Sequence, residues 1–195
     1  HRLGIVQEKE SNLIFLQWDI TQPIRTDAQF HYIIHAASDA SPSKYMSNKI
    51  ATINANILGL YNILSLDMSQ IESFLYYSTA EMYGNPSNDN IPTKESYIAP
   101  LNHLSERSCY VEAKKFRDTL CMNYFFERRL PVKMIRPFHV FGPWIDLSDG
   151  RVFSDFIANI QKGEDIIIKS DGLATRSFCY LADALDMTVK TLLLW

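Results

Sequence analysis

Short, almost continuously apolar segments alternate with helical ones along this chain, and that alternation restricts its fold more than any other feature. Five segments have strand character, namely "LIFLQ" (13–17), "YIIHAA" (32–37), "SFLYYST" (73–79), "VKMIRPF" (132–138) and "DIIIKS" (165–170). Apolar residues at helical spacing occupy 50–66, 105–128, 151–161 and 182–194. Apolar strands separated by helices predict a doubly wound α/β fold, in which helices cover both faces of a parallel sheet.

One loop in this pattern is unusually long. The stretch 84–102 exceeds what a connection from a strand to a helix needs. In a doubly wound sheet it would lie at the carboxyl edge of the strands, where ligands bind. We therefore expect the functional residues to gather around this loop.

The distribution of glycines bears on nucleotide binding. A dinucleotide-binding fold of this class has a glycine-rich turn between its first strand and first helix. The seven glycines, at 4, 59, 84, 142, 150, 163 and 172, are too far apart to form one. We expect the N-terminal strands and this turn to lie outside the sequence, which opens at His1. The alternative is a different α/β fold that binds no nucleotide.

Composition excludes several partners. The formal net charge is −3, which gives no reason to expect nucleic acid or an anionic membrane surface. No apolar run approaches the roughly 20 residues that span a bilayer. The three cysteines, Cys109, Cys121 and Cys179, are odd in number and lack metal-ligand spacing, so we expect reduced thiols, a cytoplasmic protein and no metal site.

The segment "SCYVEAKKF" places Tyr110 four residues before Lys114. On a helix this spacing puts both side chains on one face. Taken alone, the pair is more often a surface pair than a catalytic one. The alternative is a phenol and an ammonium that are placed to move protons.

Eight blocks together resemble a known family. They are "FLQWDI", "HAAS", "NANILGLYNIL", "YSTAEMYG", "YVEAK", "RPFHVFGP", "DGRVFSDFI" and "TRSFCYLADA", in that order. The chain resembles the extended short-chain dehydrogenase/reductases, specifically the NAD-dependent sugar-nucleotide epimerases, dehydratases and decarboxylases, and is most similar to UDP-glucuronate decarboxylases. It departs from that last group at Ala80 (usually Ser), at His139-Val140 (usually Asn-Thr), and at Val111 and Ala113 (usually Asp and Gly).

The resemblance implies a Rossmann-type fold with NAD as cofactor and a sugar nucleotide as substrate. Residues 1–143 would form the truncated NAD-binding domain, and 144–195 the start of a smaller substrate domain mixed with the last Rossmann elements. The implied cofactor-binding residues are Asp19, Ile20, Ala36, Ala37, Asn56, Ser78, Tyr110, Lys114, Pro137 and Val140. His35, on an apolar strand, is expected to be a core histidine with its hydrogen bonds satisfied.

The implied chemistry begins with oxidation of the sugar's C4 hydroxyl. Tyr110 would take the hydroxyl proton, although the free phenol has a pKa of about 10. A nearby Lys114 ammonium would favour the phenolate and hydrogen-bond the nicotinamide ribose. Thr79 would hydrogen-bond the same C4 oxygen; without the family context it is simply a threonine at a strand end.

Glu81 bears on the type of reaction. An epimerase needs no carboxylate there, whereas a 4,6-dehydratase needs a base for the C5 proton. A decarboxylase needs less help, because a C4 ketone makes the C5 carboxylate a β-keto acid that loses CO2 by itself. Ala80 cannot supply the acid that many dehydratases place before this glutamate. We rank decarboxylation first, 4,6-dehydration second and epimerisation third; Glu81 could also be a solvated loop carboxylate.

Four residues are expected to bind the substrate. Arg176 resembles the arginine that holds the nucleotide diphosphate, and Arg107 resembles one that meets the sugar carboxylate in decarboxylases. Arg151 lies in the "DGRVFSDFI" block of the substrate half. His139 stands where an asparagine is usual near the phosphates, so that contact is either replaced or lost. Arg107 could instead be an exposed residue at a helix start.

Two rival functions remain open. One is a non-catalytic, NAD-binding regulatory protein, which would be expected to lose Tyr110 or Lys114. The other is a scaffold or interaction subunit. The resemblance also implies a homodimer, in which the helices at 50–66 and 105–128 of two copies pack as a four-helix bundle.

Overall fold

The computed structural model describes residues 14–168 and 170–194. A central sheet contains β1 (Tyr32–His35), β2 (Ser73–Tyr77) and β3 (Val132–Ile135) in that order, and both pairs are parallel. Ile34 is opposite Leu75, which is opposite Lys133. A second parallel pair joins β4 (His139–Phe141) to β5 (Phe178–Tyr180). Helices and parallel strands therefore alternate as the sequence predicts.

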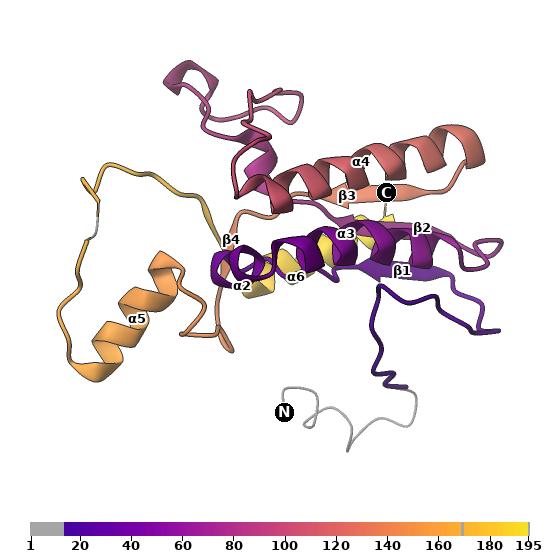
Figure 1. The fold of residues 1–195 in the computed structure, drawn as a ribbon, viewed down its shortest axis with the longest axis horizontal. Helices are drawn as coiled ribbons and strands as arrows, with labels where there is room; N and C mark the ends of the chain where they lie inside the picture. The colour runs from indigo at the N-terminus through magenta and orange to yellow at the C-terminus, as the bar shows by residue number, and fades with distance from the viewer. Residues whose placement is uncertain (1–13, 169, 195) are drawn as a thin grey trace.

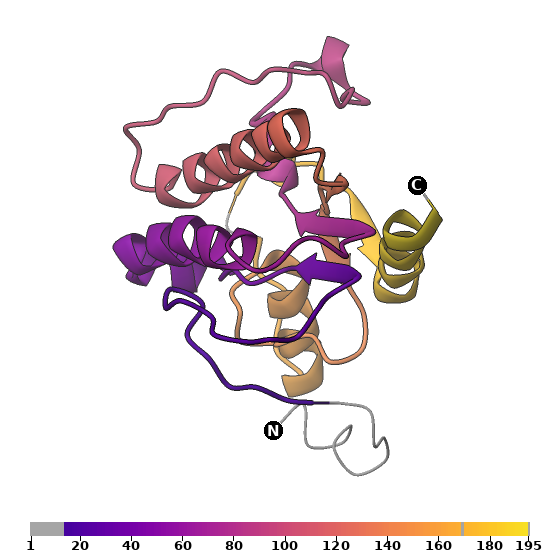
Figure 2. The ribbon, with the colours of Figure 1, turned by 90° about the vertical axis from the view of Figure 1, so that its right-hand side faces the viewer.

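Helices cover both faces of the central sheet. The pair α3 (Lys49–Leu64) and α4 (Ser108–Arg128) lies on one face, and α6 (Leu181–Leu194) lies on the other (Figure 2). The core between β2 and the helix pair contains Leu60, Leu64, Phe74, Tyr76, Cys121 and Leu130. Burial of these apolar side chains drives the helices onto the sheet. The doubly wound fold class is confirmed.

Shorter elements complete the chain. They are α2 (Pro42–Ser47), the 3-10 turns η1 (Ala80–Tyr83) and η2 (Asn88–Asn90), and α5 (Val152–Lys162). Gly163, in the left-handed region with φ 70°, ends α5, and the segment after it forms a wide loop that returns to the strands at β5 (Figure 1). The helix α2 and the strands β4 and β5 were not predicted, because runs of three to six residues carry little periodicity.

Two strand predictions are wrong. Residues 14–17 and 165–168 have no regular structure, while Leu13 and Lys169 lie outside the described residues. The apolar side chains of both segments are exposed, for example Ile14 at 83% and Ile167 at 68%. A strand needs a neighbour for its backbone hydrogen bonds, and among the described residues neither segment has one. Apolar composition alone therefore does not make a segment a strand.

The long loop leaves the sheet at a glycine. Gly84 has φ 58° and ψ −129°, a conformation that essentially only glycine adopts without strain. A Cβ atom there would lie 2.9 Å from Leu101 Cδ2 and 3.1 Å from the Cβ of Ala99. The loop thus closes on its own start, directly beside η1.

We expect Gly84→Ala to lower the free energy of unfolding by about 1–3 kcal/mol, because the alanine is strained and pushes the loop outward. Thermal or urea unfolding measures this loss. Gly163→Ala is the matched control, since Gly163 also has a positive φ but no atom within 4 Å of the added Cβ. Equal losses in the two variants would contradict the closure of the loop on Gly84.

Candidate active site

Three parallel strands end at one edge of the sheet and bring predicted cofactor residues together. Ala36 and Ala37 follow β1, Ser78 follows β2, and Pro137 lies two residues after β3. Both alanines are exposed. The backbone carbonyl of Pro137 accepts a hydrogen bond from Ala80 N (3.3 Å), which links the ends of β2 and β3. This is the edge at which ligands bind in doubly wound sheets.

Tyr110 and Lys114 project from α4 toward this edge. Their side chains are buried, with 4% and 3% of the residue exposed, so the interpretation as a surface pair is wrong. Lys114 Nζ donates a hydrogen bond to Tyr77 O (2.8 Å) and lies 5.6 Å from the centroid of the Tyr110 ring. Thr79 lies close enough to the Tyr110 phenol to lower its pKa. The structure therefore assembles Thr79, Tyr110 and Lys114 around one strand end.

Burial dominates the protonation of this pair. It raises the pKa of Tyr110 above its ordinary value, against the effect of Thr79, which lowers it. Burial also lowers the pKa of Lys114 to about 7, and the nearby Arg117 charge adds to that effect. The ligand-free protein thus holds a neutral phenol beside a lysine that is only partly charged at neutral pH.

Glu81 and Arg107 form an ion pair beside Tyr110. Thr79 Oγ1 accepts a hydrogen bond from Glu81 N (3.2 Å), which starts the η1 turn and places Glu81 after the strand. Arg107 Nη2 lies 3.8 Å from Glu81 Oε1. Burial raises the pKa of Glu81, while Arg107 and then Arg151 lower it. Glu81 is therefore a partly desolvated carboxylate with two arginines within electrostatic reach.

Tyr45 is a site residue that the sequence analysis missed. This fully buried side chain on α2 stacks on the Tyr110 ring, with centroids 4.9 Å apart and an interplanar angle of 8°. Its hydroxyl accepts a hydrogen bond from Arg107 Nη2 (2.9 Å). The residue lies within "ASPSKY", but nothing in the local spacing indicates that it would reach α4.

A second missed group supports Ser78. Its hydroxyl donates to Asp118 Oδ2 (3.2 Å), and the same oxygen lies 3.5 Å from Arg136 Nη2. Arg136 also donates to the hydroxyl of Tyr83 (3.0 Å). This network joins the ends of β2 and β3 to α4, so Ser78 has a partner within the protein.

The predicted substrate residues fall into two places. Arg107 lies beside Glu81. Arg151 and Arg176 instead act on His139: burial is the main cause that lowers the pKa of this histidine, and the charges of Arg176 and Arg151 lower it further. Arg151 donates to Ala40 O (3.3 Å) and pairs with Asp149 (Nε to Oδ2, 3.2 Å). Because Arg151 also acts on Glu81, it connects the two places.

Three predicted cofactor residues have structural contacts of their own. Asp19 Oδ1 accepts from Thr21 N and Oγ1, and Ile20 O accepts from Asn62 Nδ2 (2.8 Å) on α3. Asn56 is fully buried; its Nδ2 donates to Thr52 O and its Oδ1 accepts from Arg117 Nη1 (2.6 Å). The amide of Asn56 is thus occupied inside the protein. Val140, in contrast, lies on β4, beside His139.

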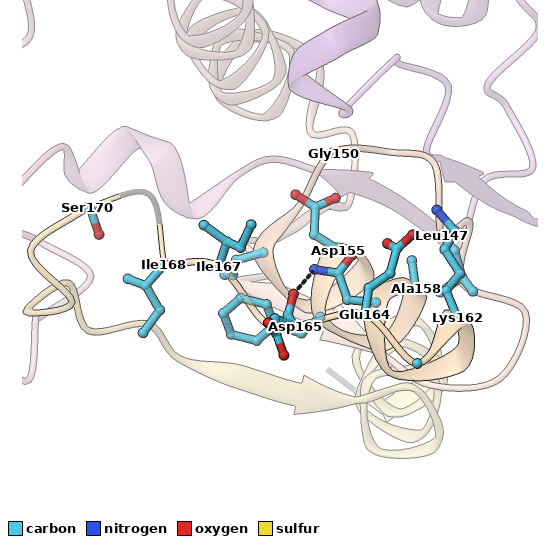
Figure 3. A pocket seen from close by; sticks show the side chains of 14 residues that line it. Leu147, Gly150, Asp155, Ala158, Lys162, Glu164, Asp165, Ile167, Ile168 and Ser170 are labelled. Carbon is cyan, nitrogen blue, oxygen red and sulfur yellow. Dashed lines mark hydrogen bonds between the residues drawn. The ribbon is translucent and has the colours of Figure 1, made fainter.

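A cavity of about 1090 Å³ lies elsewhere, between α5 and the segment that follows it (Figure 3). Asp155, Asn159, Lys162, Glu164 and Asp165 contribute its polar lining. None of Thr79, Glu81, Tyr110 and Lys114 lines it. Within residues 14–168 and 170–194, no cluster of three or more His, Cys, Asp or Glu side chains could hold a metal ion. The strand edge, rather than this cavity, carries the candidate chemistry.

His35 is buried as predicted, but its hydrogen bonds are not satisfied. It is 3% exposed, and Nε2 has no hydrogen-bond partner in the described chain. Burial, followed by the charges of Arg117 and Lys114, lowers the pKa of His35 to about 3. The imidazole is therefore neutral in the folded protein near pH 7.

Acid should destabilise the protein through this residue. The unfolded chain binds a proton at His35 near pH 6.5 and the folded chain only near pH 3, so stability falls as the pH drops through that window. Between pH 6.5 and 4.5 we expect His35 to account for a loss of about 2 kcal/mol in urea unfolding. His35→Leu should lose less stability over this range than the parent. His103→Leu, in an exposed loop, should follow the parent, and identical pH dependence in all three would contradict the assignment.

Comparison of the sequence with known protein families shows the family of this chain. The profile of the NAD dependent epimerase/dehydratase family matches residues 5–193. The chain belongs to this family. As an epimerase/dehydratase family member it is similar to UDP-glucuronic acid decarboxylase 3 of Arabidopsis thaliana, with 35% identity over 175 residues, 90% of this chain and 50% of that protein. It is 34% identical to UDP-glucuronic acid decarboxylase 1 of Xenopus tropicalis, over 90% of this chain and 41% of that protein.

Solved structures of the epimerase/dehydratase fold agree with the architecture. UDP-N-acetylglucosamine 4-epimerase from Methanobrevibacter ruminantium superposes with a TM-score of 0.78 at 23% identity, covering 94% of this chain and 58% of that one. dTDP-glucose 4,6-dehydratase from Bacillus anthracis superposes with a TM-score of 0.68 at 21% identity, covering 84% of this chain and 48% of that one. Identities this low show the fold alone. The chain spans about half the length of the curated relatives that it matches.

Proposed function

We propose that this protein modifies a sugar nucleotide with the help of NAD through a 4-keto intermediate, and that the reaction is decarboxylation of an acidic sugar. The observation that supports it most is the contact of Arg107 with both Glu81 and Tyr45, next to Tyr110 and Thr79. A guanidinium beside the proposed base can hold a sugar carboxylate while C4 faces the phenol. Sequence similarity to UDP-glucuronic acid decarboxylases points the same way.

The described residues fit one end of NAD. Exposed Ala36 and Ala37 leave the backbone after β1 open, and the buried Lys114 amine donates to Tyr77 O. Lys114 would meet the nicotinamide ribose, with Ser78, Pro137 and Val140 alongside. Asp19 and Ile20 would meet the adenine end, and Asn56 would support the site from within α3. When bound, NAD would supply the acceptor for the hydride from C4.

Tyr110 would remove the proton from the C4 hydroxyl, and Thr79 would hold the same oxygen. The phenol is buried and neutral without ligands, so it needs positive charge nearby to act as a base. Thr79 already lies close enough to the phenol to lower its pKa. The hydroxyl of Thr79 would therefore favour the phenolate.

Arg107 would bind the C5 carboxylate until it leaves as carbon dioxide. Once C4 is a ketone, the carbon–carbon bond to the carboxylate breaks and its electron pair remains on C5 as an enolate, which then takes up a proton. Glu81 would orient the ring and help to manage the enol. Ala80 has no proton to give, which disfavours the dehydratase alternative.

Arg151, Arg176 and His139 would bind the diphosphate. Arg176 and Arg151 both lie close enough to His139 to lower its pKa, and arginine suits phosphate because its donors form a rigid fork. In this proposal residues 1–143 belong to the NAD-binding domain, and 144–195 contain the start of the substrate domain together with the last Rossmann elements.

The test is to incubate the full-length protein with a panel of sugar nucleotides and to follow their masses. Loss of CO2 from an acidic sugar supports decarboxylation. Loss of water would indicate a 4,6-dehydratase, and a changed sugar of unchanged mass a C4 epimerase. Binding of NAD without turnover of any sugar nucleotide would favour the regulatory protein, and binding of neither ligand the scaffold.

A homodimer is part of the proposal. Ile50, Leu58 and Tyr61 on α3 and Phe116 on α4 are 40–70% exposed, although α3 and α4 pack side by side. Apolar patches of this kind mark protein interfaces, and a second copy would bury this one as a four-helix bundle. A monomeric mass in analytical ultracentrifugation would contradict the homodimer.

No helix among the described residues is long and apolar enough to cross a membrane. We propose a cytoplasmic location from the three unpaired cysteines.

A further inference from the structure

Arg117 is a buried charge that none of the roles above uses. It follows Tyr110 and Lys114 on α4 at spacings of seven and three residues, so all three lie on the face that meets the sheet. Its side chain is fully buried, with 0% of the residue exposed. Arginine is rarely buried completely unless its charge is paired.

The charge of Arg117 is not neutralised locally. Nη1 donates to the neutral amide oxygen of Asn56 (2.6 Å), while Nε and Nη2 have no hydrogen-bond partner. The adjacent carboxylate, Asp118, instead pairs with Arg136 and accepts from Ser78. No salt bridge joins Arg117 to a carboxylate in the part of the chain that the structure describes. A buried and unpaired cation is costly, and such costs persist mainly where they serve function.

Two cations share the ring of Tyr76. The guanidinium carbon of Arg117 lies 4.5 Å from its centroid, and Lys114 Nζ lies 5.4 Å from it. Each charge therefore acts on the other in a desolvated environment, where electrostatic interactions are weakly screened. This arrangement explains why Arg117, after burial itself, is the next cause that lowers the pKa of Lys114.

We propose that Arg117 is a positioning residue of the Tyr110–Lys114 pair, a permanent buried cation that favours the deprotonated form of both side chains. This role rests on the proposed function, in which Tyr110 acts as a base. Burial works against phenolate formation at Tyr110. The charge of Arg117 has the opposite effect and lowers the pKa of the phenol. Lys114 cannot supply the same permanent charge, because it is only partly protonated near neutral pH.

Several other groups also face Tyr110 and Lys114. Asp118 on α4 favours the charged form of Lys114. Glu81 after β2 and Tyr45 on α2 disfavour the phenolate form of Tyr110, whereas Thr79 favours it. His35 on β1 is neutral, and so is Tyr76 on β2, because burial strongly raises the pKa of its phenol. Arg117 is the cation among these groups that stays charged throughout the working pH range.

The first arm of the test is the pH profile of kcat/KM. Arg117→Met removes the charge and keeps much of the volume, so kcat/KM at pH 7 should fall about tenfold, the effect of one pKa unit. The deficit should shrink as the pH rises. Arg117→Lys should restore most of the activity. The control, Lys115→Met, removes a neighbouring cation that pairs with Glu112 instead, and should match the parent. An equal deficit at every pH would reduce Arg117 to a structural role and overturn the proposal.

The second arm needs no turnover. Titration by NMR of ring-labelled tyrosine and ε-carbon-labelled lysine, with Tyr110→Phe to assign the phenol, reports both midpoints in the ligand-free protein. In Arg117→Met both midpoints should move to higher pH, and in Lys115→Met neither should move. Unmoved midpoints reject the role of Arg117. Moved midpoints, in a protein that converts no sugar nucleotide, support the charge coupling and reject the proposed function.

Discussion

Replacing Tyr110 with phenylalanine is expected to lower kcat by about 10²–10⁴-fold, the usual contribution of general acid–base catalysis. The ring and its stack on Tyr45 remain, so the site keeps its shape and KM should change little. Steady-state kinetics of the full-length enzyme with its best sugar nucleotide measures both parameters.

Tyr124→Phe is the matched control for this substitution. It makes the same chemical change on α4, near the far end of the helix, where Tyr124 packs against the core and contacts Arg128. Its kcat should stay within about twofold of the parent, as for most substitutions away from a functional site. A Tyr110→Phe rate within tenfold of the parent would show that another group takes the proton.

The second large effect is expected at Arg107. Arg107→Ala removes a charge-assisted contact to the sugar carboxylate, a loss of about 1.5–3 kcal/mol, so KM for an acidic sugar should rise roughly 10–100-fold. A neutral sugar nucleotide should be affected far less. Arg128→Ala, at the opposite end of the same helix, should leave KM unchanged.

Glu81→Gln completes this experiment, because it separates the candidate reactions. In a dehydratase Glu81 must take the C5 proton, and its loss should cost about 10²–10⁴-fold with transient NADH and no product. In a decarboxylase the loss should be smaller, since carbon dioxide leaves without that base. The substitution also weakens the 3.8 Å pair with Arg107, which frees the guanidinium for the substrate. An inactive Glu81→Gln with accumulated NADH, together with a silent Arg107→Ala, would favour the dehydratase.

Local pattern predicted most of the larger elements. The helices at 50–66 and 105–128 correspond to α3 and α4, and the segments around 33, 75 and 134 form the parallel sheet. Periodicity indicates the two long helices, because each packs a long face against the core, whereas the three strands were predicted from their short apolar runs. The segments at 13–17 and 165–170 look equally apolar but lack a paired neighbour among the described residues. Strand pairing is a property of two segments, so one segment's composition could not decide it.

Residue type and spacing along the chain were enough to predict the fold class, the family and the helix face that presents Tyr110 and Lys114. The tertiary structure alone decided the charges and contacts of that site. It stacked Tyr45 on Tyr110, joined Arg107 to Glu81, and buried Arg117 beside Lys114. Burial and neighbouring charge set the protonation of a side chain, and both arise only when segments distant in sequence meet.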